Sequence, residues 1–286
     1  MIIDTHVHFY DTTRPGGVPW PPEDNELLYR PVLPHHFVER TEKMGVAGTV
    51  VVEASQLVED NQWILDLAAD NPCIVGFVGR LDPQTEDFEK NLDLFSANPL
   101  YRGIRLGLQR GSLEDQDALM PQLQKLADRD LQLDLMTNSK QLPINAVIAE
   151  QIPDLRIVID HVAHVEVTGE APDPEWVQGI QTIARYPNVY CKVSGMVERA
   201  AQQPAPDDPA YYVPTLDVLW HAFGEDRLVY GSNWLVCERA APYETVLSIV
   251  THYIETKGPE AMEKFFWKNS KAAYKWIERE KTRIDE

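Results

Sequence analysis

Cysteine, basic charge and long apolar runs are all scarce in this sequence of 286 residues. Its three cysteines (Cys73, Cys191 and Cys237) are widely spaced, so they form neither a disulfide framework nor a zinc finger, and a reducing compartment is the simplest setting. No apolar run approaches the roughly 20 residues that cross a bilayer. The N-terminus has neither a basic start nor a small-residue cleavage site. We therefore expect a cytoplasmic protein that does not bind a membrane.

The shortage of basic residues makes the chain strongly acidic. Lysine and arginine total 26 against 45 aspartates and glutamates, which gives a formal net charge of −19 at pH 7. Nucleic-acid binding needs clustered basic side chains for phosphate contacts, so we exclude nucleic acid as a partner. Acidic charge keeps an enzyme soluble and says little about a pocket inside it. The expected partner is a small-molecule substrate, and homo-oligomerisation stays open.

Short β-branched segments alternate with helical segments along the whole chain. Helical spacing is clear at 60–70, where Asp60 is the expected N-cap, and at 119–130. Strands that alternate with helices pair in parallel, and eight such units predict an α/β fold with a single (β/α)8 TIM-type barrel over 1–286. No G-x-G-x-x-G motif supports a dinucleotide-binding open sheet instead. The predicted strands are 1–7, 48–53, 73–79, 103–106, 131–136, 156–160, 189–194 and 228–232.

Two long segments, at about 10–34 and 198–214, interrupt this alternation. The first is rich in proline and glycine, and the second is rich in alanine, proline and aspartate. Each follows a predicted strand, which places it on the C-terminal rim, where the active sites of such barrels form. We expect these rim insertions to set substrate specificity.

Two histidines, His6 and His8, end the first predicted strand. Strand side chains alternate between faces, so residues two apart point the same way and both imidazoles can enter the barrel mouth. Neutral imidazole is a common zinc ligand. The pair is therefore either a metal site or two incidental histidines, and its place at the strand end favours the site. Asp4, on the same face and one layer deeper, is expected to support the ligands.

His161 ends the sixth predicted strand. If its side chain faces inward, Ile157 and Ile159 line the barrel below it and Asp160 faces the helices. A histidine that closes a buried β-branched run can be a satisfied core residue. Its position at the C-terminal end of a barrel strand favours a functional role instead.

Charged residues lie near the ends of three more strands. Glu53 could ligate a metal, act as a base or pair with Arg105. Arg105 has the fork geometry that suits a substrate carboxylate or a developing oxyanion, and a structural Glu53–Arg105 ion pair is the alternative. Lys192 either points inward, toward the substrate, or covers helix surface with its stem.

Asn233 reaches the rim after the eighth predicted strand. An asparagine side chain donates and accepts hydrogen bonds but takes up no proton at neutral pH. Asn233 is therefore not a general base, and we expect it to orient a water molecule or a substrate hydroxyl.

Several motifs, in their order and places along the strands, resemble one enzyme superfamily. They are D-T-H-V-H at 4–8, I-D-H at 159–161, G-S-N-W at 231–234 and F-F-W-K-N-S-K-A-A-Y at 265–274. From Ile3 to about Trp276 the chain is similar to amidohydrolases, in particular the "amidohydrolase 2" branch with its sugar lactonases, 2-pyrone-4,6-dicarboxylate lactonase and related decarboxylases. The resemblance implies a distorted barrel that hydrolyses an ester, lactone or amide-type bond. It also implies that His6, His8 and His161 bind metal or contact substrate.

This chain departs from the family pattern in its metal ligands. The family usually has an aspartate at the position of Asn233, where it binds metal and activates water. The family's histidine on strand five has no counterpart, since that strand offers only Asp134. Too few ligands remain for a binuclear site. The resemblance leaves either one divalent ion, zinc first among them, or no metal, because lactonases of this branch can work without one. The expected ligands are His6, His8 and His161.

The leading hypothesis is hydrolysis of a sugar-acid lactone or related cyclic ester. His6 and His8, with or without zinc, would polarise the carbonyl, while His161 or Glu53 activates water. Substrate-binding residues would be Arg105 and Lys192, with Trp20, Tyr10 and Trp234 as apolar walls against a ring. The alternatives are a zinc-dependent decarboxylase of the same superfamily, which Asn233 disfavours, and a catalytically lapsed relative that only binds a small molecule.

Overall fold

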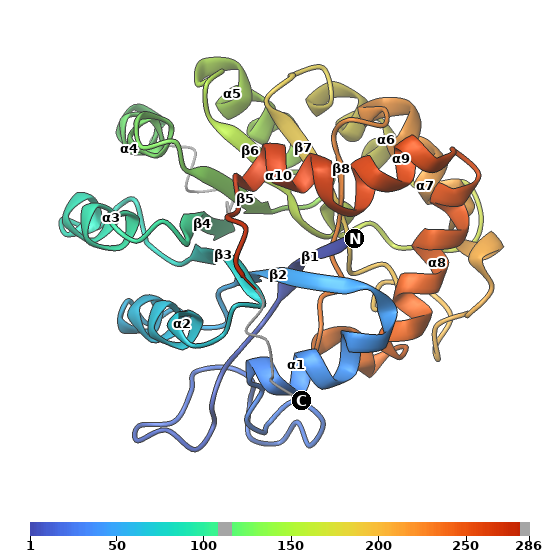
Figure 1. The fold of residues 1–286 in the computed structure, drawn as a ribbon. Coiled ribbons are helices and arrows are strands. Elements are labelled where there is room, and N and C mark those ends of the chain that lie inside the picture. The colour runs from blue at the N-terminus through green and yellow to red at the C-terminus, as the bar shows by residue number, and fades with distance from the viewer. Residues whose placement is uncertain (108–115, 281–286) are drawn as a thin grey trace.

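The computed structural model, which describes residues 1–107 and 116–280, is a parallel β-barrel with helices on its outside (Figure 1). The strands follow one another around the sheet in chain order, and a parallel bridge from Val7 to Trp234 joins the first strand to the end of the last. The (β/α)8 prediction is confirmed. The strands are β1 Ile2–Val7, β2 Val46–Val52, β3 Ile74–Gly79, β4 Tyr101–Gly107, β5 Gln132–Met136, β6 Arg156–Ile159, β7 Val189–Val193 and β8 Leu228–Tyr230.

Helices separate the strands and cover the outer face of the barrel (Figure 1). The prediction that Asp60 caps the second of them is wrong, because that helix begins one residue earlier. Asp60 lies in its first turn, where a carboxylate is favourable for the helix dipole, and it pairs with Arg14. The helices are α1 Pro34–Thr41, α2 Glu59–Ala69, α3 Phe88–Ser96, α4 Gln116–Asp128, α5 Leu142–Gln151, α6 Pro174–Ile183, α7 Val213–Phe223, α8 Tyr243–Glu255, α9 Pro259–Glu263 and α10 Asn269–Tyr274.

The apolar core has two parts, as the alternation of strand side chains requires. In β2, Val51 packs in the larger cluster between sheet and helices, whereas Val50 and Val52 belong to a smaller cluster inside the barrel. The inner cluster also contains Tyr274 of α10 and Trp276. The barrel interior is thus packed with side chains and is not a pore.

Helix α10 closes the end of the barrel at which the strands begin. Arg102, in β4, donates from Nε to the Tyr274 carbonyl at 2.9 Å, and Arg156, which opens β6, donates to the Ala273 carbonyl at 2.8 Å. Figure 1 shows α10 crossing this end beside the N-terminus. The opposite, C-terminal ends of the strands are left for a site. Over the described residues, no helix is long and apolar enough to cross a membrane.

The first rim insertion folds back over the C-terminal end of the barrel. Tyr10 and Val32 pair as an antiparallel bridge at its base, and Trp20 packs against His8 with 5.7 Å between the ring centroids. The second insertion bridges from Ala200 to Val167 and ends in a short 3₁₀ turn, Pro209–Tyr212, before α7.

Candidate active site

A cavity of about 450 Å³ opens at the C-terminal ends of the strands. This cavity lies at the rim, where the sequence analysis predicted the site. Residues from β1 to β6, from the segment after β8 and from the first rim insertion line it. They include His8, Trp20, Glu53, Arg80, Arg105, Met136, His161 and Asn233.

The two histidines of β1 lie at different depths. His8 lines the cavity, whereas His6 is fully buried beneath it, with 4.9 Å between the two ring centroids. The register of β1 against β2 shifts between Asp4 and Val7. The expectation that Asp4 shares the face of the histidines is wrong, because its carboxylate accepts hydrogen bonds from the Ser232 N–H and from Tyr243 of α8. Asp4 does support His6, by accepting its backbone N–H at 3.1 Å.

Lys192 lies below the cavity in a buried charge network. Its Nζ is 2.7 Å from Asp134 Oδ2, 2.8 Å from Asp160 Oδ1 and 3.1 Å from His6 Nδ1. Burial opposes the charge, but the two carboxylates raise the pKa of Lys192 above its ordinary value, so it stays an ammonium ion. Lys192 donates hydrogen bonds to Asp134 Oδ2 and His6 Nδ1, and its contact with Asp160 Oδ1 is an ion pair. Lys192 therefore does point inward, but its side chain is fully enclosed and is not among the residues that line the cavity.

The carboxylates of this network respond differently to burial. Burial raises the pKa of Asp134 to about 7, although Lys192 and the Tyr274 hydroxyl at 3.0 Å favour its charged form. For Asp160, attraction to Lys192 outweighs burial and holds the pKa well below its ordinary value. Asp160 is therefore a permanent anion beneath the cavity.

The prediction that Asp160 faces the helices is wrong. In β6, Val158 lies inside the barrel and Ile157 and Ile159 pack outside it, so Asp160 takes the inner face. His161 would then point outward, but its backbone is left-handed, with a φ of 50°. This turn brings His161 to the cavity directly after Asp160.

Gly195 makes room for that turn. Its φ is +68°, and a Cβ placed on it would lie 3.0 Å from both Cβ and Nδ1 of His161. Both the backbone conformation and the close approach require glycine. The preceding residue, Ser194, supports the same side chain, since its Oγ contacts His161 Nδ1 at 2.9 Å.

The hydrogen-bond partners of the imidazoles determine which nitrogen carries the proton. A carbonyl only accepts, so His8 Nδ1, 3.0 Å from the Val52 carbonyl, carries a proton and leaves Nε2 unprotonated. An ammonium only donates, so His6 Nδ1 accepts from Lys192 and its proton lies on Nε2. Burial lowers the pKa of His8 to about 3 and the pKa of His6 and of His161 well below the usual range. All three rings are neutral at neutral pH.

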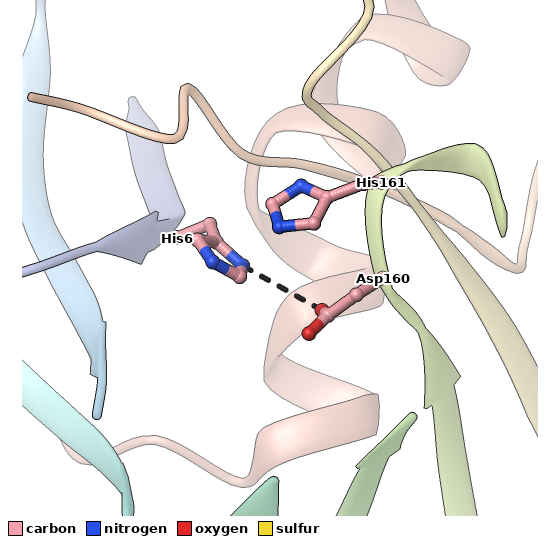
Figure 2. A group of neighbouring side chains, drawn as sticks. All are labelled: His6, Asp160 and His161. Carbon is pink, nitrogen blue, oxygen red and sulfur yellow. Dashed lines mark ion pairs between the residues drawn. The ribbon is translucent and has the colours of Figure 1, made fainter. Parts of the chain in front are cut away.

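Three buried side chains could hold a metal ion. His6, Asp160 and His161 bring their donor atoms within 4.8 Å of one another, and Figure 2 shows them pointing toward one another. Within the described ranges, His6 Nε2 and both carboxylate oxygens of Asp160 are buried without a hydrogen-bond partner. Two imidazoles and a carboxylate are a suitable donor set for zinc. Asp160 thus joins two of the predicted ligands in this group, and His8 lies outside it.

Glu53 and Arg105 form the ion pair that we considered as the structural alternative. Arg105 Nε donates to Glu53 Oε1 at 2.9 Å, and its Nη2 donates to the Glu53 backbone carbonyl at 3.1 Å. Both line the cavity. Arg80, which the sequence analysis missed, lines it beside them and donates to the Arg105 carbonyl at 3.2 Å. Its position directly after β3 was the available signal.

Only one of the three predicted aromatic walls faces the cavity. Trp20 lines it. Trp234 is 2% exposed, packs on Phe37 and is not among the lining residues, and Tyr10 is buried against Trp20 with its hydroxyl bonded to the Leu28 carbonyl. In this structure the rings of Trp234 and Tyr10 are instead used in packing the rim.

Asn233 reaches the cavity and is paired with a carboxylate. Its Nδ2 donates to Glu198 Oε1 at 2.7 Å. Its φ is +62°, a conformation that asparagine tolerates better than most residues. Burial raises the pKa of Glu198 to about 7. Glu198 begins the second rim insertion, and nothing in the local sequence distinguished it.

Comparison with known proteins adds a family to this geometry. A family model described as amidohydrolase matches residues 3–276. A protein of Burkholderia ambifaria named L-fucono-1,5-lactonase is 31% identical over 246 residues, which cover 84% of this chain and 82% of that protein. A second protein of that name, from Burkholderia multivorans, is 26% identical over 276 residues, which cover 93% and 92%.

Solved structures share the fold over nearly the whole chain. A crystal structure of an amidohydrolase from Burkholderia multivorans with bound zinc superposes with a TM-score of 0.84 at 23% identity. The match covers 97% of this chain and 100% of that one. At this identity the likeness supports the barrel architecture only.

Proposed function

Because the chain belongs to the amidohydrolase family, we propose that it is a hydrolase that opens a sugar-acid lactone or related cyclic ester by attack of water. The observation that carries the proposal is the 31% identity to an L-fucono-1,5-lactonase. The cavity supports it, because neutral imidazoles, two arginines and an asparagine line it together. L-fucono-1,5-lactone is the first substrate to test.

His8 is the base in this proposal. Its proton lies on Nδ1, so the unprotonated Nε2 is free to take a proton as water attacks the lactone carbonyl. A pKa of about 3 makes His8 a weak base, which is sufficient only for an activated ester such as a lactone. We prefer it to Glu53, whose carboxylate is held by Arg105.

His161 and Asn233, which also line the cavity, assist in this step. The Ser194 hydroxyl can donate to His161 Nδ1, which leaves a proton on Nε2 to donate to the carbonyl oxygen as negative charge develops there. Asn233 orients the attacking water. The new C–O bond forms first and gives a tetrahedral oxyanion. The ring C–O bond then breaks as the carbonyl re-forms, and the proton held by His8 passes to the departing ring oxygen. The product is an open-chain hydroxy acid.

A divalent ion, zinc first among them, would be held by His6, Asp160 and His161. When bound, it would polarise the carbonyl as a Lewis acid. For His6 to bind it through Nε2, the imidazole proton must move to Nδ1, where Lys192 now donates. The same imidazole therefore cannot accept from Lys192 and ligate the ion through Nε2.

The test is hydrolysis of a lactone panel by the wild type and by His8→Ala and His161→Ala. Loss of a general base, or of a hydrogen-bond donor to the developing oxyanion, lowers kcat/KM by about 10²- to 10⁴-fold. His252→Ala, an exposed histidine of α8, is the matched control and should retain activity. A wild type that opens no lactone would refute the function. Full activity of His8→Ala would refute the assignment of the base alone.

A further inference from the structure

Glu198 is a buried carboxylate that the mechanism above does not use. Its Oε1 accepts a hydrogen bond from Asn233, and its Oε2 is buried with no hydrogen-bond partner within the described part of the chain. Glu198 itself is not among the residues that line the cavity, whereas Asn233 is. Any effect of Glu198 on the substrate must therefore pass through Asn233.

The chemistry of this pair determines which atom Asn233 presents. A carboxylate only accepts hydrogen bonds, so it must face the NH₂ group of the carboxamide. The Oδ1 atom of Asn233 is then turned away from Glu198, and Asn233 lines the cavity. There it is an acceptor for the O–H of a water molecule or of a sugar hydroxyl.

We propose that Glu198 is a positioning residue for hydrolysis, which fixes the Asn233 carboxamide with Oδ1 toward the cavity so that the attacking water is held by an acceptor. This inference rests on the proposed lactone hydrolysis. The family usually has an aspartate where this chain has Asn233. In this proposal the Glu198 carboxylate still contributes to the reaction, but it acts through the Asn233 side chain.

The surroundings of Glu198 make the pair sensitive to pH. Burial raises the pKa of Glu198 to about 7, against the lowering effects of Asn233 and Arg239. Among the described residues, the other titratable groups facing it are Tyr212 and Cys237, and burial raises the pKa of both, so they stay neutral. Below pH 7 the Glu198 hydroxyl can donate to Oδ1, and the carboxamide then turns its NH₂ group to the cavity. Activity should therefore rise as pH increases through about 7.

The experiment measures kcat and KM against pH for the wild type, Glu198→Gln and Glu170→Gln. Glu170 is an exposed glutamate of the segment between β6 and α6 and serves as the control. A glutamine at 198 can either accept from or donate to Asn233, so it no longer fixes the carboxamide, and in Glu198→Gln we expect kcat to fall about tenfold to hundredfold with KM changed far less. The rise of kcat with pH near pH 7 should be absent in this variant. Burial also raises the pKa of Asp134 to about 7, but a pH dependence caused by Asp134 would persist in Glu198→Gln.

A second variant separates positioning from a structural role. In Asn233→Ala the carboxamide is gone, so adding Glu198→Gln should lower kcat no further. A double variant whose loss of kcat is the product of the two single losses would overturn the proposal. An unchanged pH dependence of kcat near pH 7 in Glu198→Gln would also overturn it. Thermal unfolding of each variant shows whether it is folded.

A binding measurement distinguishes this inference from the proposed function. Calorimetric titration with L-fuconate, the acid formed by opening L-fucono-1,5-lactone, needs no turnover. We expect its affinity to change through pH 7 in the wild type and not in Glu198→Gln. A wild type that binds with this pH dependence but opens no lactone would refute the function and leave the positioning intact. Identical pH dependence in both proteins would refute the positioning.

Discussion

The substitution Lys192→Met tests the buried network beneath the cavity. It removes an ammonium ion with three acceptors at 2.7, 2.8 and 3.1 Å, while methionine keeps the volume of the side chain. Asp134 retains the Tyr274 hydroxyl, but Asp160 loses its only cation within 3 Å among the described residues and keeps His6 at 3.5 Å. Breaking a buried ion pair by removing one partner costs about 3–5 kcal/mol. A typical domain has only about 5–15 kcal/mol in total, so the loss is a large share of it.

Urea unfolding at several pH values measures this loss. In the wild type, Lys192 holds the pKa of Asp160 low, so its stabilisation is present at neutral pH and disappears only as pH falls through that low pKa. In Lys192→Met the uncompensated carboxylate can be protonated instead. The deficit relative to wild type should therefore be largest near pH 7 and shrink below about pH 4. Lys90→Met, at an exposed surface pair, is the control.

A double variant completes the test. Lys192→Met with Asp160→Asn removes the uncompensated charge and should recover stability relative to Lys192→Met alone, with a coupling of about 0.5–3 kcal/mol. The inference is refuted if the free energy of unfolding of Lys192→Met is within about 1 kcal/mol of that of the wild type, or if the difference is the same at all pH values. Either result would show that Lys192 does not form a buried ion pair of this strength.

Two further predictions concern the metal and the left-handed turn. Metal analysis should find at most one ion per chain. Treatment with EDTA should lower kcat/KM less than about tenfold, because a lactone carbonyl needs little polarisation. A hundredfold loss of kcat/KM that zinc restores would contradict this. Gly195→Ala should lower the free energy of unfolding by about 1–2 kcal/mol for the positive φ alone, and more because the new Cβ meets His161. Gly107→Ala, which meets no described residue closer than 3.4 Å, is its control, and equal thermal stability of the two variants would show that the turn adapts.

Strand periodicity was sufficient to predict the barrel and insufficient to predict every side chain inside it. All eight predicted strands exist. Each is marked in the local sequence by a short β-branched run between turn residues, so it can be predicted without knowledge of the fold. The inner face could not be assigned where the backbone departs from a regular strand. The expected orientation of Asp160 assumed regular strand alternation up to His161. The left-handed φ of His161 ends that alternation, so Asp160 and His161 both point inward. At Asp4 the register shift in β1 had the same effect.

Residues placed by tertiary packing also escaped prediction. Trp234 and Tyr10 have the composition of a substrate wall, but each ring is buried in the rim itself. Glu198 lies in an insertion whose sequence shows no pattern, and only the folded chain brings it to Asn233. Such contacts join residues 35 positions apart, so no local signal encodes them.

The H-x-H motif shows why the chemistry of a site needs partners as well as spacing. Spacing alone assigns His6 and His8 the same role, since both were expected to polarise one carbonyl. Their partners have opposite character, because the Val52 carbonyl only accepts and the Lys192 ammonium only donates. His8 is therefore left with a lone pair on Nε2, and His6 is left with an N–H there. A lone pair beside the cavity can act on water, whereas an N–H beneath it must give up its proton before it can bind metal. The two histidines are consequently not interchangeable, and substituting Lys192 should change the chemistry of His6 while leaving the tautomer of His8 unaltered.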